Sequence, residues 1–303
     1  MSTTTEGQFE LQGGVKAYTK TWTPSGPIRA HLVFVHGFSE HINRYNEFFA
    51  TVAEQGIQVL AWDQRGWGRT SPSKADWGNS GPTTQVIADV AAFVKGSLAA
   101  REGKAPLFVM GHSMGGGEVC TLMGDPQYAE LVGQVRGWLL ECPFIGFVPS
   151  QEPSFLKVFF GRLAGRVFPH QKLKFSPPPE YLSRVPEVVE SIRADPMCHD
   201  TGTLEALAGI LDRTAVLASG TVPVRKEVRS LWLAHGTEDK VCSYDSAKKW
   251  FEAQKGLEDK TFVKYEGGYH QLHADLCKEQ YGKDMIAWIL EKSEEGKPVE
   301  AKL

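Results

Sequence analysis

The sequence predicts an α/β fold, with a mostly parallel central sheet, helices on both faces of the sheet and an inserted helical segment. Short apolar runs recur along the 303-residue chain, and the segments between them have apolar residues at helical spacing. Strands that are apolar throughout and alternate with helices are typical of a parallel sheet covered on both faces. Residues 148–223 show no evident strand, contain many prolines and are too long for a loop in a compact domain. They are therefore the predicted insertion.

The first half of the chain begins with a predicted hairpin. Residues 8–12 and 15–22 alternate in polarity around Gly13-Gly14, which is the pattern of two strands joined by a tight turn. Apolar runs then predict strands at residues 31–35, 58–62, 107–110 and 137–140. Helical spacing predicts helices at residues 44–55, 82–100 and 117–123.

Strands and helices alternate again after the insertion. Strands are predicted at residues 230–235 and 261–265, and helices at residues 243–254 and 276–292. The predicted domain organisation is a core of residues 1–147 and 224–303, with residues 148–223 as a helical cap or lid. In a sheet of this kind, sites form beyond the carboxyl ends of the strands. The residues that directly follow each strand are therefore the candidates for chemistry.

Ser113 is the candidate nucleophile. It is the central residue of G-H-S-M-G at 111–115, a G-x-S-x-G pattern between an apolar strand and a small-residue helix start. Strand, tight turn and helix are the context in which this pattern forms a nucleophile elbow. The serine then occupies a strained turn, which the flanking glycines permit because they have no side chain. The alternative interpretation is a glycine-rich turn with a surface serine.

A serine nucleophile needs a base, and the base needs an acid to orient it. After a nucleophile elbow, the acid and then the histidine follow along the chain. Asp239 comes just after a predicted strand, and adjacent Glu238 is its competitor because only one of two neighbours can face the site. His270 follows two glycines after the last predicted strand. His273 is its rival, but it lies farther from the strand end, so we predict Asp239 and His270.

Negative charge that develops on a reacting carbonyl needs two backbone N–H donors, an oxyanion hole. One donor should come from Met114, which follows the nucleophile. The other should come from the loop H-G-F-S-E-H at 36–41, after the strand at residues 31–35. Phe38 is the favoured donor, because Gly37 lets the backbone approach closely.

Five stretches spread over the core carry a family resemblance. They are His36–His41 with Arg44-Tyr45, Asp63–Ser71, Gly111–Gly117, His235–Cys242 and Tyr265–His273. The chain resembles the serine hydrolases of the α/β-hydrolase superfamily and, more narrowly, the monoglyceride (monoacylglycerol) lipases of fungal type. G-H-S-M-G-G is shared by many hydrolases. The combination of H-G-x-x-E-H with G-x-Y-H-x-L-H is more specific to monoglyceride lipases and their lysophospholipase-like relatives.

The resemblance implies an α/β-hydrolase fold and hydrolysis of monoacylglycerol to glycerol and fatty acid through an acyl-enzyme, with no metal and no organic cofactor. Ser113 then matches the nucleophile, Asp239 the acid and His270 the base. Phe38 and Met114 match the oxyanion positions.

The resemblance also implies a polar cluster near the glycerol end of the substrate, formed by Glu40, Arg44 and His273. The alternative for these three residues is a buried ion pair that only fixes the loop. Cys242 resembles a cysteine near the site, or it is simply a small buried apolar residue.

The most apolar part of the predicted cap is Phe155–Phe168, in which lysine and arginine residues are interleaved. We expect this segment, with Phe159 and Phe160, to cover the acyl chain of the substrate. We also expect it to rest transiently on a membrane or lipid-droplet surface, with its basic residues toward the head groups. The alternative is a cap helix that only packs on the core.

Composition narrows the function classes and the location. The 33 basic and 36 acidic residues give a net charge of −3 with no dominant basic stripe, which excludes a nucleic-acid partner. Five cysteines without a C-x-x-C pattern predict reduced thiols and no metal site. The chain start lacks a secretory signal and no apolar run is long enough for a membrane span, which predicts a cytoplasmic protein, peripheral on lipid droplets or membranes. Ala301-Lys302-Leu303 resembles a peroxisomal address, or is the end of a frayed helix.

Two other functions remain open at this stage. A broad-specificity carboxylesterase or lysophospholipase could use the same three catalytic residues, and only the cap would separate it from a monoacylglycerol lipase. A non-catalytic hydrolase-like binding protein is the second alternative. Such proteins often lose the acid or the base, whereas Ser113, Asp239 and His270 are all present.

Overall fold

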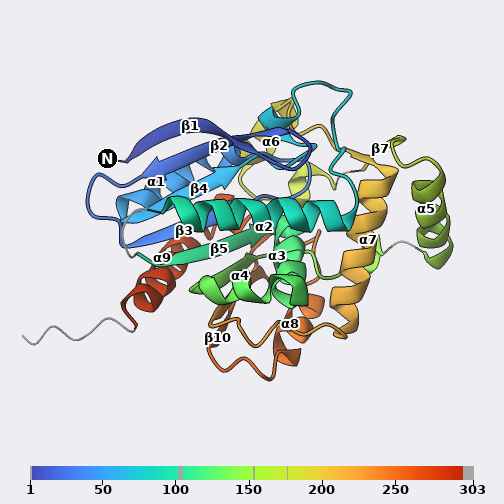
Figure 1. The fold of residues 1–303 in the computed structure, drawn as a ribbon. Helices are drawn as coiled ribbons and strands as arrows, with labels where there is room; N and C mark the ends of the chain where they lie inside the picture. Colours follow the sequence, from blue (N-terminus) through green and yellow to red (C-terminus); the bar gives the residue numbers. More distant parts are fainter. Residues whose placement is uncertain (1, 102–104, 153, 176, 296–303) are drawn as a thin grey trace, which may run out of the picture.

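An eight-stranded sheet forms the centre of the protein in the computed structural model, which describes residues 2–101, 105–152, 154–175 and 177–295, with the backbone alone for 155–160. The strand order is β1-β2-β4-β3-β5-β6-β9-β10 (Figure 1). Neighbouring strands from β4 to β10 run parallel, whereas β1 with β2 and β2 with β4 are antiparallel. The predicted mostly parallel sheet is thus confirmed. Its strands are β1 (Thr3–Glu10), β2 (Lys16–Thr23), β3 (Ala30–Val35), β4 (Ile57–Trp62), β5 (Leu107–His112), β6 (Gly137–Glu141), β9 (Leu231–Gly236) and β10 (Lys260–Tyr265).

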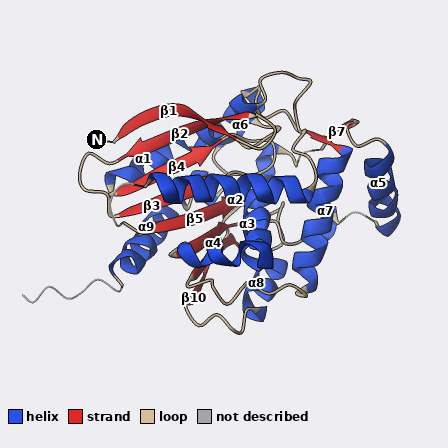
Figure 2. Cartoon of the chain, viewed as in Figure 1, coloured by secondary structure: helices blue, strands red, loops and turns tan. Residues whose placement is uncertain are grey.

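Helices cover both faces of this sheet, as predicted (Figure 2). The helices around the sheet are α1 (Asn46–Glu54), α2 (Thr83–Ala100), α3 (Ser113–Gly124), α4 (Ala129–Gln134), α8 (Tyr244–Ala253) and α9 (Lys278–Glu294). Successive side chains of a strand point to opposite faces. In β5, Leu107 and Val109 therefore join the core with α2, α3, α4 and α8, whereas Phe108 and Met110 join the core with α1 and α9.

Residues 148–223, which we call the cap, separate β6 from β9 in the sequence. The cap contains the helices α5 (Phe155–Val167), α6 (Pro186–Ala194) and α7 (Leu204–Ser219). Helix α7 packs against α2 and α3 of the core and also against α5. In Figure 1, α5 lies beyond α7 at the end of the molecule farthest from β1 and β2.

The cap differs from the prediction in one respect, because it is not wholly helical. Strands β7 (Lys172–Lys174) and β8 (Thr201–Thr203) pair in an antiparallel ribbon. Three residues are too few to show a strand period in the sequence. The position of β8 is set by tertiary contact, since the Thr203 N–H donates to the carbonyl of Gly78, 3.0 Å away in the core. The six-residue helix α4 of the core was likewise too short to be predicted.

The loops after β3, β5, β9 and β10 all leave the same edge of the sheet, because these strands are parallel. They bring the segments that follow Val35, His112, Gly236 and Tyr265 together. Among the described residues, no helix combines the length and the apolarity that a membrane crossing requires.

Candidate active site

Ser113 lies at a tight elbow between β5 and α3. Its φ is +53°, which is unfavourable for a residue with a side chain. A Cβ at Gly111 would lie 2.5 Å from the Gly115 carbonyl oxygen, and a Cβ at Gly115 would lie 2.3 Å from the Val35 carbonyl oxygen. Only glycine fits at these two positions. The G-x-S-x-G pattern is therefore required by close packing within the elbow, at Gly111, and against the end of β3, at Gly115.

Ser113, His270 and Asp239 form one chain of hydrogen bonds. The Ser113 Oγ lies 2.9 Å from Nε2 of His270, and Nδ1 of His270 lies 2.9 Å from Oδ2 of Asp239. All three side chains are buried. An ionised carboxylate can only accept hydrogen bonds, so Nδ1 carries the imidazole proton. Nε2 is then free to accept the proton of the serine hydroxyl.

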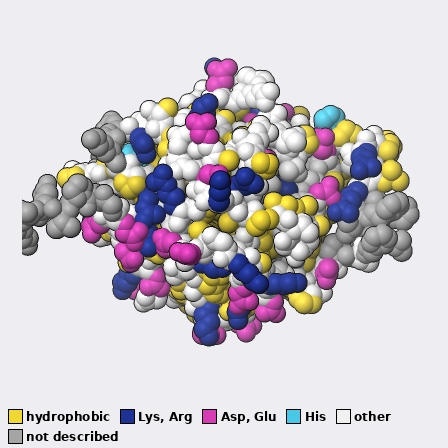
Figure 3. Space-filling model, turned by 60° about the horizontal axis from the view of Figure 1, so that its bottom comes forward, with side chains coloured by type: hydrophobic (Ala, Val, Ile, Leu, Met, Phe, Trp, Pro, Cys, Tyr) yellow, Lys and Arg dark blue, Asp and Glu magenta, His cyan; other side chains and the backbone are white. Residues whose placement is uncertain are grey.

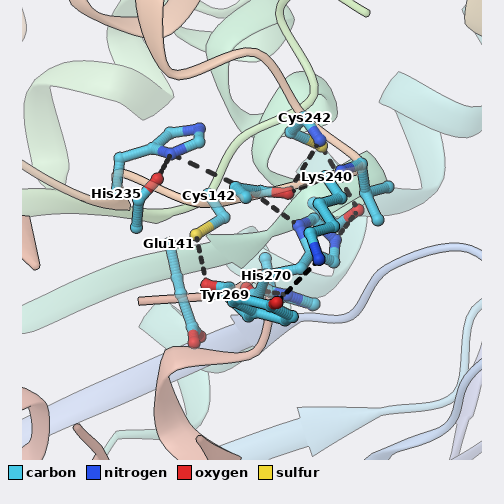
Figure 4. Close-up of polar contacts among 12 residues, drawn as sticks. Glu141, Cys142, His235, Lys240, Cys242, Tyr269 and His270 are labelled. Carbon is cyan, nitrogen blue, oxygen red and sulfur yellow. Dashed lines mark hydrogen bonds and ion pairs between the residues drawn. The ribbon is translucent and has the colours of Figure 1, made fainter. Parts of the chain in front are cut away.

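The surroundings of Asp239 favour its ionised form, and they include His235, Cys242 and His270, which Figure 4 labels. Its Oδ1 accepts hydrogen bonds from the backbone N–H groups of Val241, at 2.8 Å, and Cys242, at 3.0 Å. Burial alone would raise the pKa of this carboxyl. The adjacent imidazoles of His270 and His235 and the hydrogen bonds outweigh burial, so the pKa of Asp239 lies below its ordinary value.

The two rival residues lie elsewhere. Glu238 is exposed to solvent, and its backbone N–H donates to the carbonyl of Gly268. His273 is buried against Glu141, with its Nδ1 2.8 Å and its backbone nitrogen 3.0 Å from Oε1 of that residue. The structure thus brings Asp239 and His270 to Ser113, and it brings neither Glu238 nor His273 there.

The two predicted oxyanion donors belong to segments beside the nucleophile. Met114 is in the first turn of α3, where backbone N–H groups have no partner within the helix. Phe38 lines the same cavity as Ser113. Gly37, just before Phe38, is so close that a Cβ there would lie 3.0 Å from the Cβ of Ser113.

A buried network around Glu40 holds the Phe38 loop in place. Oε1 of Glu40 accepts a hydrogen bond from the Gly37 N–H, and it lies 2.9 Å from both the Tyr45 hydroxyl and Nδ1 of His112. Nε2 of His112 lies 3.4 Å from the His270 carbonyl oxygen. Glu40 and His112 therefore link the loop after β3, the elbow and the loop that carries His270.

Glu40 and His112 form an ion pair. Burial alone would lower the pKa of the His112 imidazole, but the carboxylates of Glu40 and then Glu141 raise it to about 9. Burial would raise the pKa of Glu40, yet the His112 charge and hydrogen bond hold it well below its ordinary range. Both groups are therefore charged at neutral pH.

This ion pair predicts how stability changes at alkaline pH. Because the pKa of His112 in the folded state lies above that of an unfolded histidine, about 6.5, its stabilisation is complete below that pH and is lost as pH rises through about 9. We expect the melting temperature of wild type to fall between pH 7 and 9.5 more steeply than that of His112→Asn. Calorimetry over this range measures both slopes.

The exposed His170 supplies the control for this experiment. His170→Gln should keep the wild-type slope, because its ring is not part of the buried network. Parallel curves for wild type and His112→Asn would contradict a charged His112.

A cavity of about 280 Å³ opens onto Ser113 and His270 between the core and the cap. Its core side carries Glu40, Arg44 and Gln271, and its cap side includes Leu182, Ile192 and Cys198. Phe38 and Val241 add apolar side chains on the core side, and Arg193 and Asp200 add charged ones on the cap side, so both sides of the cavity are mixed.

The predicted substrate-binding residues are not all in this cavity. Glu40 and Arg44 line it, whereas His273 does not. Arg44 bonds to the cap, with its Nη1 3.2 Å from Oδ2 of Asp195 and its Nη2 2.8 Å from Oγ of Ser191. The side chains of Phe159 and Phe160 lie outside the described part of the chain.

Three groups of side chains have donor atoms close enough for a metal ion within the described ranges. Each group is already engaged in other bonds. One shares Asp239 and His270 with the serine chain. The second consists of His112, which pairs with Glu40, and of Glu141 and His273, which pair with each other. In the third, the Asp195 carboxylate is bound by the Arg44 cation. None of the three presents a free set of ligands.

Sequence reasoning did not select several residues that shape the site. His112 lies inside the G-x-S-x-G pattern, and its position beside the serine is a signal that could have found it. Ser39 and Asp200 both line the cavity and bond to each other, but no motif relates residues so far apart. Cys242, noted for its resemblance, has its Sγ 3.9 Å from the Ser113 Oγ.

Comparison with known proteins agrees with this geometry. Residues 26–276 match the family described as serine aminopeptidase, S33. The "Putative monoglyceride lipase" of Schizosaccharomyces pombe is 32% identical over 94% of this chain and 74% of its own length. The "Monoacylglycerol lipase" of Mycolicibacterium smegmatis is 28% identical over 95% of this chain and 98% of its own length.

A solved structure shows the same fold. The crystal structure of a soluble variant of monoglyceride lipase from Saccharomyces cerevisiae matches with a TM-score of 0.83 at 19% identity. The match covers 96% of this chain and 97% of that chain. The family resemblance seen in the motifs is thereby confirmed, and this chain belongs to the serine aminopeptidase S33 family, with the α/β-hydrolase fold.

Proposed function

We propose that this protein is a serine hydrolase that cleaves monoacylglycerol to glycerol and free fatty acid. The observation that carries the proposal is the hydrogen-bonded chain of Ser113, His270 and Asp239 at the base of a cavity between core and cap. Relatives that match nearly all of the chain bear the names of monoacylglycerol and monoglyceride lipases. A cavity that offers polar side chains to glycerol and apolar side chains to an acyl chain suits such a substrate.

In the proposed reaction, His270 takes the Ser113 proton at Nε2 as the serine oxygen attacks the acyl carbonyl carbon. The backbone N–H groups of Phe38 and Met114 stabilise the oxyanion. Asp239 holds the imidazole in the correct tautomer and stabilises its protonated form. His270 then gives its proton to the departing glycerol oxygen. Water, deprotonated by the same histidine, attacks the acyl carbon, and His270 returns the proton to the departing Ser113 oxygen as the fatty acid is released.

A substrate panel tests the proposal against its alternatives. The panel contains mono-, di- and triacylglycerol, lysophosphatidylcholine, a short p-nitrophenyl ester and an aminoacyl-naphthylamide. We expect kcat/KM for monoacylglycerol to exceed that for the di- and triacylglycerols by at least tenfold. Turnover of the short ester alone would indicate a general esterase, and turnover of the naphthylamide alone would indicate a peptidase. No turnover and no labelling by a fluorophosphonate would support a binding protein.

The cap is proposed to act as a lid, on the core of residues 1–147 and 224–303, and to rest on a membrane or lipid-droplet surface. Five apolar side chains between residues 163 and 175 are strongly exposed, with Phe168 at 63% as the extreme; they are Leu163, Val167, Phe168, Leu173 and Phe175. We call them the apolar cap patch. Exposed Arg166 and Lys174 lie among them in the sequence. Figure 3 shows hydrophobic and basic side chains together at the end of the molecule where α5 lies.

An apolar surface with basic neighbours suits a lipid interface carrying anionic head groups. The double variant Phe168→Ser/Leu173→Ser should therefore lower the rate on monoacylglycerol in anionic vesicles about three- to tenfold, which corresponds to about 1 kcal/mol of lost interfacial binding. The rate on a soluble p-nitrophenyl ester should stay unchanged.

Leu276→Ser is the matched control, because Leu276 is 69% exposed but lies outside the cap. It should leave both rates unchanged. Equal losses on vesicles and on the soluble ester would mean that the apolar cap patch has only a structural role. The peroxisomal address at 301–303 stays a prediction, because these residues lie outside the described part of the chain.

A further inference from the structure

Ser39 has a strained backbone next to the proposed oxyanion donor. It directly follows Phe38, and its φ is +57°, in the left-handed region that favours glycine. A residue with a side chain persists in this conformation only where its surroundings hold it there. The partner that holds Ser39 therefore also holds the chain directly after Phe38.

That partner is Asp200 of the cap. The Ser39 hydroxyl donates to Oδ1 of Asp200 at 2.8 Å and accepts from the Asp200 backbone N–H at 2.8 Å. Asp200 also has a left-handed backbone, with a φ of +55°. Two strained residues from different parts of the chain thus hold each other through a reciprocal pair of hydrogen bonds.

Aromatic rings reinforce the same contact. The Phe38 ring packs edge-on against Trp67, with ring centroids 4.7 Å apart. His199, next to Asp200 in the cap, is stacked between Trp67 and Trp77 at 5.0 and 4.6 Å. Burial lowers the pKa of His199 to about 4, so this stack is uncharged at pH 7. The cap residues beside Asp200 are therefore firmly seated on the core.

The Phe38 amide is consequently held from two sides. On the core side, Glu40 accepts the hydrogen bond of the Gly37 N–H. On the cap side, Asp200 binds Ser39. The Phe38 N–H lies between these two anchors, so its direction depends on the cap as well as on the core.

We propose that Asp200 is a positioning residue, which acts through Ser39 to aim the Phe38 N–H at the oxyanion. This inference rests on the proposed serine-hydrolase function, with Phe38 as an oxyanion donor. Its consequence is that the cap contributes to transition-state stabilisation and does more than cover the substrate.

The test compares Asp200→Ala, Asp200→Asn and Ser39→Ala on a soluble p-nitrophenyl ester. Asparagine keeps the Oδ1 acceptor and should retain at least half of the wild-type kcat. Complete loss of an oxyanion donor lowers kcat about 100- to 1000-fold, and a misdirected donor should cost less. We expect Asp200→Ala and Ser39→Ala each to lower kcat about tenfold, with KM changed less than twofold. The variant that changes both Ser39 and Asp200 should be no slower than either single variant, because each substitution removes the same hydrogen-bonded pair.

An alkyl trifluoromethyl ketone gives a readout that a merely structural role would not move. The Ser113 oxygen adds to its carbonyl carbon, the hydroxyl proton goes to His270, and the carbonyl oxygen becomes an oxyanion. Its inhibition constant should rise about tenfold in Asp200→Ala. The affinity for a non-hydrolysable ether analogue of monoacylglycerol, which forms no oxyanion, should not change.

Asp212→Ala is the matched control, because Asp212 is an exposed acid of cap helix α7 that pairs with Arg162. It should leave kcat, KM, the inhibition constant of the ketone and the affinity for the ether analogue unchanged. If Asp200→Ala does not fold, Ser39→Ala carries the test, since alanine removes only the Ser39 hydroxyl that bonds to Asp200. An unchanged kcat in a folded variant, or equal weakening of ketone and ether, would overturn the proposal. Failure of the proposed function is recognised separately, by a wild type that neither hydrolyses esters nor binds the ketone.

Discussion

Replacing Ser113 by alanine should lower kcat/KM for monoacylglycerol by about 10⁴- to 10⁶-fold, since without the nucleophile only binding and the oxyanion donors remain. The Ser113 Oγ is the atom that lies 2.9 Å from the His270 base. Alanine removes that atom and little else, and a small side chain fits the elbow. We therefore expect the variant to fold and to bind substrate with an affinity close to that of wild type. Steady-state kinetics and fluorophosphonate labelling, read by mass spectrometry, measure the effect.

Ser293→Ala is the matched control for this prediction. Ser293 is also buried, and its hydroxyl donates to the Ile289 carbonyl within α9, away from the cavity. The control removes the same atom and should keep both activity and labelling. If Ser113→Ala kept more than a hundredth of the wild-type activity in folded protein, Ser113 would not be the nucleophile.

The sequence predicted the core of the fold because the strands have a plain signal. Strands β3, β5, β6 and β9 are buried along their whole length, so their apolar runs stand out between polar segments. Parallel strands also place the segments after them at one edge of the sheet. Ser113, Asp239 and His270 could be selected on that basis, although they are far apart in the sequence.

Other parts of the site have no local signal. Strands β7 and β8 have three residues each and form through contacts of the cap with the core. The bond between Ser39 and Asp200 joins two polar residues of loops, and neither residue type predicts a partner at such a distance. Glu40 and His273, which were predicted with Arg44 to form a polar cluster, pair with His112 and Glu141, and no motif indicates these two partners. Such pairings depend on how side chains are oriented in three dimensions.

The choice between Glu238 and Asp239 shows the same limit and leads to the second large effect. The sequence places both carboxylates just after β9, and a shift of one residue exchanges their directions. In the structure, Asp239 is buried with its Oδ2 2.9 Å from Nδ1 of His270, and Glu238 is exposed. Adjacent acids with such different surroundings should differ greatly in their contribution to catalysis.

Asp239→Asn is expected to lower kcat by about 10⁴-fold, because a neutral amide no longer holds the imidazole in the required tautomer or stabilises its protonated form. The fold should survive, because the amide oxygen of asparagine can still accept the N–H groups of Val241 and Cys242, which now bond to Oδ1. KM should change little, since the carboxylate contacts the imidazole and does not line the cavity. Steady-state kinetics with a soluble ester measures both constants.

Glu238→Gln makes the same chemical change one residue earlier in the chain. Its carboxylate is exposed, so the expected change in kcat is less than twofold. The kcat of Glu238→Gln should thus exceed that of Asp239→Asn by about 10⁴-fold. Because the two variants lose the same charge at neighbouring positions, this ratio measures the effect of where each carboxylate lies relative to His270. A loss shared equally by the two variants would mean that the negative charge of this loop acts at a distance. A loss confined to Glu238→Gln would exchange the roles of the two acids and overturn the hydrogen-bonded chain on which the proposed mechanism depends.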